Sequence, residues 1–159
     1  MKRIVIVAAA LVVGSAVWAL EAHKAPAPAA APSRDAKVVK ALAAYRAAFE
    51  ARSIEKLAET VDPDLLVLEG TTQNVGWPDY RDNHIGPEMK EWESLAYSEF
   101  KVVDCEVAGD LAWAATTAAV TIVTAGKPMT LDVAESFVLR RKDGAWRIRH
   151  LHWSGKRRK

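Results

Sequence analysis

The stretch 129-MTLDVAESFVLRRKDGAWRIRHLHWS-154 holds two runs of alternating apolar and polar residues on either side of one Asp-Gly pair. An Asp-Gly pair in that setting is a strong hairpin signal, because both central residues of a tight two-residue turn need a positive φ. The sequence therefore predicts strands at 129–141 and 145–154, joined by Asp143 and Gly144.

Alternation in the last strand predicts which side chains share a face of the sheet. One face carries every second residue: Trp146, Ile148, His150, His152 and Ser154. With a two-residue turn, Phe137 lies opposite His150 and Glu135 lies opposite His152. A glutamate on an otherwise apolar face needs a polar partner, and directly opposed side chains approach within about 5 Å. We therefore predict that both histidines face the interior and that His152 pairs with Glu135.

Two more strands, at 97–107 and 111–124, precede the hairpin. A turn centred on Gly126-Lys127 would place Ala118 opposite Glu135. Small residues at this position and its neighbours leave open space above that part of the sheet.

The domain begins with helices. Apolar residues at steps of four, three and four form one helix face, and they are Val38, Leu42, Tyr45 and Phe49. Ser53 can cap a second helix at 54–61.

A short strand at 64–69 and a loop at 70–76 are expected next. A helical segment at 79–85 follows, which Gly86-Pro87 interrupts before another turn at 87–92. Helices followed by a run of antiparallel strands define the α+β class. A long helix packed on one curved sheet would leave a cone-shaped cavity.

This order of elements, with the ending 146-WRIRHLHWS-154, resembles the NTF2-like superfamily and within it the SnoaL-like, DUF4440-type domains. The resemblance covers residues 35–154. It implies a cone of N-terminal helices on a curved, mainly antiparallel sheet, a pocket on the concave face and often a homodimer. The superfamily includes isomerases, cyclases, hydrolases, dehydratases and domains that only bind, so the resemblance implies fold more than function.

The resemblance also implies site residues. These domains often have a carboxylate-Gly pair after the first strand, a histidine in the next helix and a terminal His-x-His-Trp-Ser. Here Glu69-Gly70, His84 and 150-HLHWS-154 match these features.

A metal ion is one expected occupant of the pocket. His150 and His152 stand two residues apart on a strand, with Cα atoms about 6.6 Å apart, and can point at one ion. His84 and Glu69 would complete four ligands, while Glu135 either binds the ion or orients His152. An imidazole-rich set favours zinc, copper or iron. The alternative is a hydrogen-bonded polar pocket without an ion.

Acid–base catalysis on a small organic molecule is a second hypothesis, because Glu and His in an apolar pocket can exchange protons near neutral pH. Glu69, Glu135 and His84 are the candidates for the catalytic base. Pocket walls are predicted from Trp77, Tyr80 and Trp92. A third hypothesis is a binding domain without turnover.

The N-terminus has the pattern of an export signal. A basic start at Lys2-Arg3 precedes a long apolar run, and Val17-Trp18-Ala19 suits signal peptidase. We expect a signal peptide at 1–19, an Ala/Pro-rich linker at 20–34 and a periplasmic or secreted domain. The alternative is a membrane tether, because the 17 apolar residues from Ile4 to Leu20 approach the length of a bilayer span.

The net charge of +2 comes from the two ends of the chain. Without Lys2, Arg3 and the four basic residues at 156–159, the remainder carries −4. No basic surface with interleaved aromatic residues is evident, so nucleic acid is not an expected partner. Residues 155–159 are predicted to form a solvated basic tail.

Overall fold

The computed structural model describes residues 35–159, so the predicted signal peptide and linker lie outside the described residues. The helical elements are α1 (Ala36–Glu50), α2 (Ile54–Thr60), α3 (Trp77–Tyr80), the π-helical turn η1 (Arg81–Ile85) and α4 (Gly86–Glu91). The strands are β1 (Val61–Glu69), β2 (Thr72–Val75), β3 (Ser94–Ala108), β4 (Leu111–Thr124), β5 (Lys127–Lys142) and β6 (Ala145–Arg157). None of the helices in this part of the chain has the length and apolarity needed to span a membrane.

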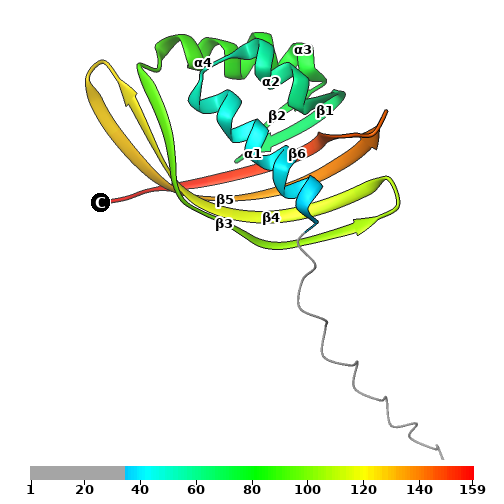
Figure 1. The fold of residues 1–159 in the computed structure, drawn as a ribbon. Coiled ribbons are helices and arrows are strands. Elements are labelled where there is room, and N and C mark those ends of the chain that lie inside the picture. Colours follow the sequence, from blue (N-terminus) through cyan, green and yellow to red (C-terminus); the bar gives the residue numbers. More distant parts are fainter. Residues whose placement is uncertain (1–34) are drawn as a thin grey trace, which may run out of the picture.

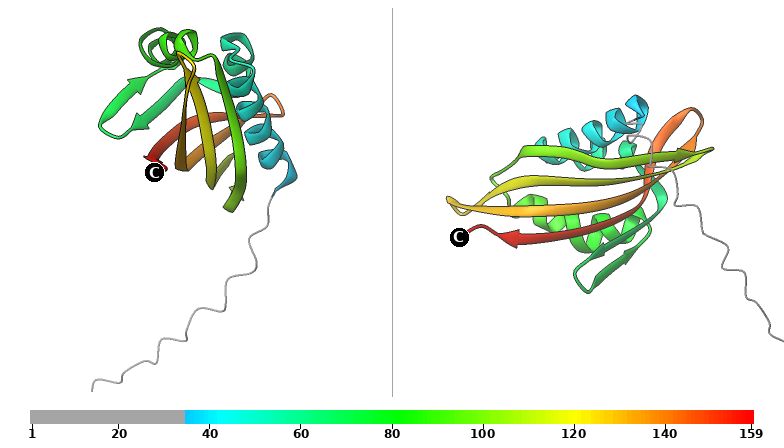
Figure 2. Two further views of the ribbon diagram at one scale, coloured as in Figure 1. Left: turned by 90° about the vertical axis from the view of Figure 1, so that its left-hand side faces the viewer. Right: turned by 90° about the horizontal axis from the view of Figure 1, so that it is seen from below.

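The six strands form one sheet in the order β2-β1-β6-β5-β4-β3. Strand β1 runs parallel to β6, and every other neighbouring pair is antiparallel. The sheet curves, α1 crosses its concave face, and α2, α3 and α4 gather over one end (Figures 1 and 2). The predicted α+β cone is therefore confirmed.

Helix α1 begins as the sequence pattern requires. Asp35 caps it by accepting hydrogen bonds from the backbone N–H groups of Lys37 and Val38. The four residues of the predicted apolar face are all buried in the core between α1 and the sheet: Val38, Leu42, Tyr45 and Phe49. The hydroxyl of Ser53 accepts from the N–H of Lys56 and caps α2, as predicted.

Two predicted boundaries are wrong. Strand β1 starts at Val61 rather than at residue 64, and the expected loop at 70–76 contains β2, which pairs with β1. A four-residue strand with mostly polar side chains gives little periodic signal. The pairing nevertheless matters, because it brings Asn74 of β2 beneath the helical segment.

The two hairpin turns differ in outcome. Asp143 and Gly144 form the predicted turn with φ values of 52° and 77°. The preceding turn is Ala125-Gly126 rather than Gly126-Lys127, since Thr124 pairs with Lys127. Glu135 therefore lies opposite Thr116 instead of Ala118.

The pair Gly86-Pro87 does not interrupt the helical segment. The N–H of Gly86 donates to the carbonyl of Arg81, five residues back, so η1 connects α3 to α4 with one wide turn. A Cβ at position 86 would overlap that carbonyl, so only glycine fits there. Because the helix continues, His84 and Glu88 lie on one face.

Strand β6 contains a bulge that the alternating pattern does not reveal. Ile148 pairs with Leu139 of β5, but His150 pairs with Val138, so Arg149 is one residue in excess. An extra residue reverses the alternation beyond it. The predicted inward orientation of His150 and His152 is therefore wrong, and Trp153 rather than His152 lies opposite Glu135.

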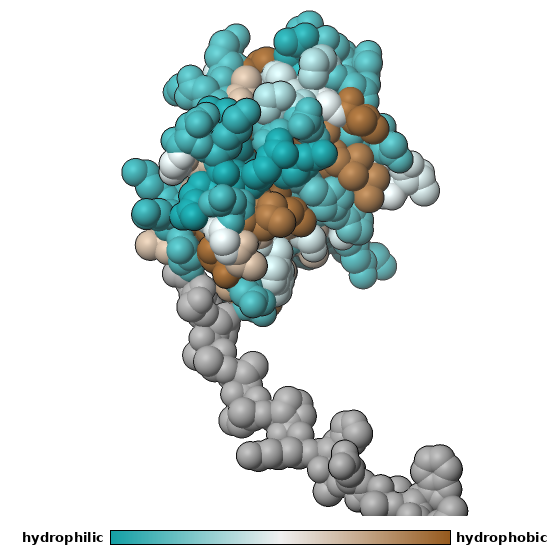
Figure 3. Space-filling model, turned by 90° about the vertical axis from the view of Figure 1, so that its right-hand side faces the viewer, coloured by the Kyte–Doolittle hydropathy of each residue, from teal (hydrophilic) through white to brown (hydrophobic). Residues whose placement is uncertain are grey.

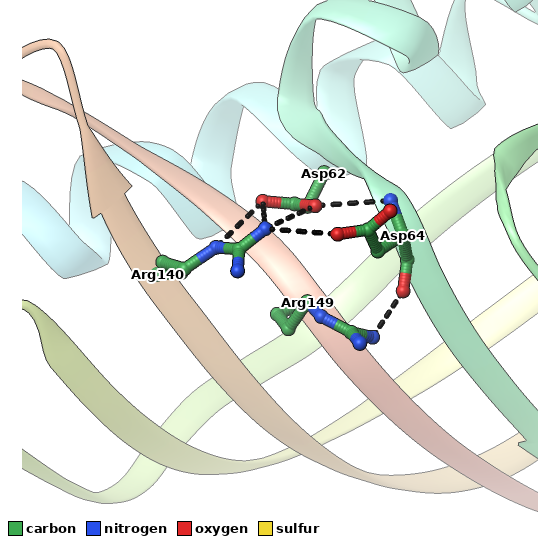
Figure 4. A network of polar contacts seen from close by, with 4 residues as sticks. All are labelled: Asp62, Asp64, Arg140 and Arg149. Carbon is green, nitrogen blue, oxygen red and sulfur yellow. Dashed lines mark hydrogen bonds and ion pairs between the residues drawn. The ribbon is translucent and has the colours of Figure 1, made fainter.

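Four charged residues surround this bulge (Figure 4). The guanidinium of Arg140 donates to both carboxylate oxygens of Asp62, at 2.7 to 3.0 Å, and Arg149 donates to the backbone carbonyl of Asp64. Burial favours the neutral form of Asp62, but hydrogen bonds from the Asp64 N–H and from Arg140 outweigh it and lower the pKa. These contacts join β1 to β5 and β6 where the alternation changes.

Strand β6 continues past Ser154, the predicted end of the domain, to Arg157. The next residue, Arg158, donates to Glu99 at 2.9 Å and to Asp132 at 2.7 Å. Residues 155–159 are all exposed, and Arg158 forms these ion pairs at the surface. On the face shown in Figure 3, hydrophobic residues form several patches interrupted by polar ones.

Candidate functional site

A cavity of about 270 Å³ lies between the helices and the concave face of the sheet. Aromatic side chains contribute much of its wall: Tyr45, Phe49, Tyr80, Trp92, Tyr97 and Trp153. Three carboxylates also line it, those of Glu69, Glu88 and Glu91, and no lysine or arginine is among its lining residues. The cavity is therefore an aromatic pocket with an acidic side.

His84 contacts two of these carboxylates. Its Nε2 lies 3.2 Å from Glu69 Oε2 and 3.6 Å from Glu88 Oε1. Glu69 ends β1, and Glu88 is one helical turn beyond His84, so a strand and a helix converge here. The His84 side chain is only 11% exposed, and its ring packs edge-on against Tyr80 with centroids 5.2 Å apart.

The other ring nitrogen fixes the orientation of His84. Nδ1 lies 2.7 Å from Oδ1 of Asn74, a buried residue of β2. The Asn74 amide nitrogen donates to Asp79 Oδ2 at 3.3 Å, which identifies its other end as the acceptor. Hydrogen bonds from Asn83 and from the N–H of Val75 lower the pKa of Asp79, so this acceptor stays ionised. Nδ1 therefore carries a proton, and Nε2 is the nitrogen that can gain or lose one.

The carboxyl groups of Glu69 and Glu88 lie close enough to His84 Nε2 to exchange a proton with it. Burial raises the pKa of Glu69, and the nearby His84 opposes the rise. Burial also raises the pKa of Glu88, where His84 again opposes it and Glu69 adds repulsion. A raised pKa makes the protonated form of each carboxyl group more accessible, which favours proton exchange with a neighbouring base.

Glu135 is buried beneath the cavity wall with only one of its oxygens bonded. Thr116 donates its hydroxyl to Oε2 at 2.8 Å, and Oε1 has no hydrogen-bond partner. Burial raises the pKa of Glu135, with the Thr116 hydrogen bond and Arg46 opposing the rise. Glu135 shares its face of β5 with Leu131, which lines the cavity, and lies opposite Trp153, which also lines it.

The structure divides the four predicted metal ligands between two places. Glu69 and His84 are together at the cavity, whereas His150 and His152 lie on the other face of the sheet. There, His150 Nδ1 lies 3.2 Å from the carbonyl oxygen of Leu66, and His152 is exposed. Within residues 35–159, no group of three or more His, Cys, Asp or Glu side chains has a geometry that could hold an ion.

The predicted pocket walls are partly present. Tyr80 and Trp92 line the cavity, whereas Trp77 packs against Tyr80 at a centroid distance of 6.3 Å and is not among the lining residues. Sequence reasoning missed Asn74 and Glu91 and placed Trp153 on the opposite face. The spacing of four between His84 and Glu88 was the available signal for their contact.

Comparisons with known proteins agree with this architecture. The SnoaL-like domain family matches residues 38–156. A ketosteroid isomerase-like protein from Erwinia carotovora atroseptica is similar in structure, with a TM-score of 0.66, 19% identity, and coverage of 76% of this chain and 94% of that one. A protein provisionally assigned as a dehydratase of the NTF2-like family, from Streptomyces avermitilis, has a TM-score of 0.68 and 18% identity, with the same two coverages of 76% and 94%.

A third similar structure is a type 2 hexachlorocyclohexane dehydrochlorinase, with a TM-score of 0.62, 14% identity, and coverage of 78% of this chain and 84% of that one. These identities show a shared fold. No curated protein sequence matches the chain.

Proposed function

Since the chain belongs to the SnoaL-like domain family, whose members have the NTF2-like fold, we propose that it binds a small organic molecule in the cavity and transfers a proton on it through His84. Related folds include an isomerase-like protein and a dehydrochlorinase. The observation that carries the proposal is the contact of His84 Nε2 with Glu69 and Glu88 beside an aromatic cavity.

The proposed step begins with neutral His84, whose Nδ1 proton is held by Asn74. Nε2 then accepts a proton from an acidic C–H bond of the bound molecule. The resulting imidazolium lies between Glu69 and Glu88, whose negative charge stabilises it. Return of the proton to another carbon would give an isomerisation, and loss of a neighbouring leaving group would give an elimination.

Proton exchange tests this step without a known substrate. Small cyclic ketones are incubated with the protein in D₂O, and deuterium incorporation next to the carbonyl is followed by mass spectrometry. We expect exchange above the buffer rate, and a loss of about 100-fold in His84→Gln, since a positioned general base contributes at least that factor. Glu69→Gln should retain part of the exchange, because it removes charge stabilisation but leaves the base.

The control is His152→Gln, which changes the same residue type on the opposite face of the sheet. It should exchange as the unchanged protein does. Absence of exchange in the unchanged protein, or full exchange in His84→Gln, contradicts the proposal.

We also propose that the domain is exported, on the support of the basic start, apolar run and cleavage pattern of its N-terminus. N-terminal sequencing of the full-length protein after expression in a bacterium with a periplasm tests this. A mature chain starting at residue 20 supports cleavage, and retention of Met1 in the membrane fraction supports the tether. A full-length chain in the cytoplasmic fraction contradicts both.

A further inference from the structure

We propose that the cavity selects ligands that combine one aromatic ring with a positively charged amine. The inference rests on the proposed organic-ligand site and adds the chemical class of its ligand. It follows from the charges of the lining residues, a buried carboxyl group with a free oxygen, and the aromatic walls.

The charge of the cavity is strongly one-sided. Glu69, Glu88 and Glu91 line it, and neither lysine nor arginine does. His84 contacts two of the three carboxylates, and Arg46 acts on Glu135 and Tyr97 from outside the lining. A bound anion would meet the three lining carboxylates inside a partly water-excluded space, where repulsion is stronger than in bulk water. A cation would meet the opposite field.

Glu135 gives an independent reason to expect a donor in the ligand. Its side chain is 2% exposed and its Oε1 has no partner, although a buried acceptor without a hydrogen bond is costly. Glu135 is not itself a lining residue, but it lies opposite Trp153, which lines the cavity, and shares its face of β5 with the lining residue Leu131. A ligand ammonium or N–H group that moved past Trp153 would supply the donor that this oxygen lacks.

The walls and the size of the cavity restrict the rest of the ligand. Trp92, Trp153 and Tyr97 are among the lining residues, and aromatic faces attract cations through the ring quadrupole. A volume of about 270 Å³ is near the lower end of the range for ligand pockets. The cavity therefore suits a single ring with a short amine arm.

Three probes of matched size separate charge from shape: 2-phenylethylamine, 2-phenylethanol and phenylacetate. Binding is measured by calorimetry and by NMR shifts of the tryptophan indole N–H signals, at neutral pH and low salt. We expect the amine to bind about tenfold more tightly than the alcohol, since a charged hydrogen bond adds roughly 1.5 kcal/mol. Phenylacetate should bind most weakly, and added salt should reduce the preference for the amine.

The double substitution of Glu88→Gln and Glu91→Gln should reduce the amine-to-alcohol ratio to about twofold, because two of the lining charges are gone. Glu59→Gln, an exposed residue of α2 outside the cavity, is the matched control and should keep the full ratio. Equal or tighter binding of the alcohol or the acid overturns the amine preference but leaves the organic-ligand site intact. Failure of all three probes to bind overturns both.

Discussion

His84, in the helical turn η1, and the pair His150–His152, in β6, lie on opposite sides of the sheet and have very different surroundings. His84 is fixed through both ring nitrogens, by Asn74 on one side and by two carboxylates on the other. His150 has one contact with a backbone carbonyl, and His152 is exposed. The sequence predicted the pair as metal ligands, because two histidines two residues apart in a regular strand point to the same side. Hydrogen bonding and burial instead identify the single histidine.

The outward orientation of His150 and His152 follows from one extra residue in β6, Arg149. Without Arg149 as a bulge, strict alternation would place both β6 histidines on the side of the cavity. With it, Leu151 and Trp153 take that side and the histidines leave it. Leu151 is accordingly 2% exposed.

The largest expected effect comes from the reversed alternation of side chains beyond the bulge in β6. Leu151→Ala should lower the free energy of unfolding by about 3 kcal/mol, the usual cost of truncating a buried leucine. His152→Ala should change it by less than about 0.5 kcal/mol, as surface substitutions do. Urea denaturation of the two variants measures both values. Equal costs, or a larger cost for His152→Ala, would show that the strand alternates without a bulge.

Much of the fold could be predicted from the sequence because it depends on local signals. The Asp143-Gly144 turn, the apolar face of α1 and the Ser53 cap each involve a few neighbouring residues. The β6 bulge lies beside contacts between residues far apart in the chain, since Arg149 donates to the Asp64 carbonyl and Arg140 of β5 donates to Asp62. No pattern within β6 itself reports those contacts.

The same distinction applies to the site. Glu69 and His84 were predicted from a family resemblance, and they meet at 3.2 Å. Asn74 was missed because β2 is short and polar, so its pairing with β1 gave no periodic signal. Contacts that depend on a turn, a bulge or a short strand require the three-dimensional structure.

The two faces of the sheet also differ in that the cavity side carries a buried carboxyl group, that of Glu135, and the variant Glu135→Gln tests its effect on stability. Its pKa in the folded state is raised by burial, so the folded protein holds this proton to a higher pH than the unfolded chain does. The unfolding free energy therefore falls as pH rises from the unfolded pKa through the folded one. Glu135→Gln lacks this loss and should be more stable than the unchanged protein by about 1 kcal/mol at neutral pH.

Thermal and urea unfolding between pH 4 and pH 8 would measure the gap between the two proteins. It should be smallest at the acid end and widen as pH increases. A gap independent of pH would mean that Glu135 ionises alike in the folded and unfolded chains.

A smaller effect is expected in the titration of Glu69. Its pKa should lie above the usual glutamate range because burial raises it more than His84 lowers it. In His84→Gln the neighbour that lowers the pKa of Glu69 is lost, so this pKa should rise further. Carboxyl ¹³C shifts followed by NMR against pH measure this, with His152→Gln as the control that should leave Glu69 unchanged. A decrease in His84→Gln would contradict the contact.

The smallest expected effect is that of added zinc. An ion that binds the folded protein raises its melting temperature according to concentration and affinity. The four proposed ligands lie on two faces of the sheet, with Glu69 and His84 at the cavity and His150 and His152 behind it, so they cannot share one ion. We expect zinc, copper or iron in severalfold excess to leave the melting temperature unchanged. A rise that disappears in the double variant His150→Ala with His152→Ala would place the ion on the outer face. A rise that disappears only in His84→Gln would place it at the cavity instead, with Glu69 and Glu88 as its further ligands.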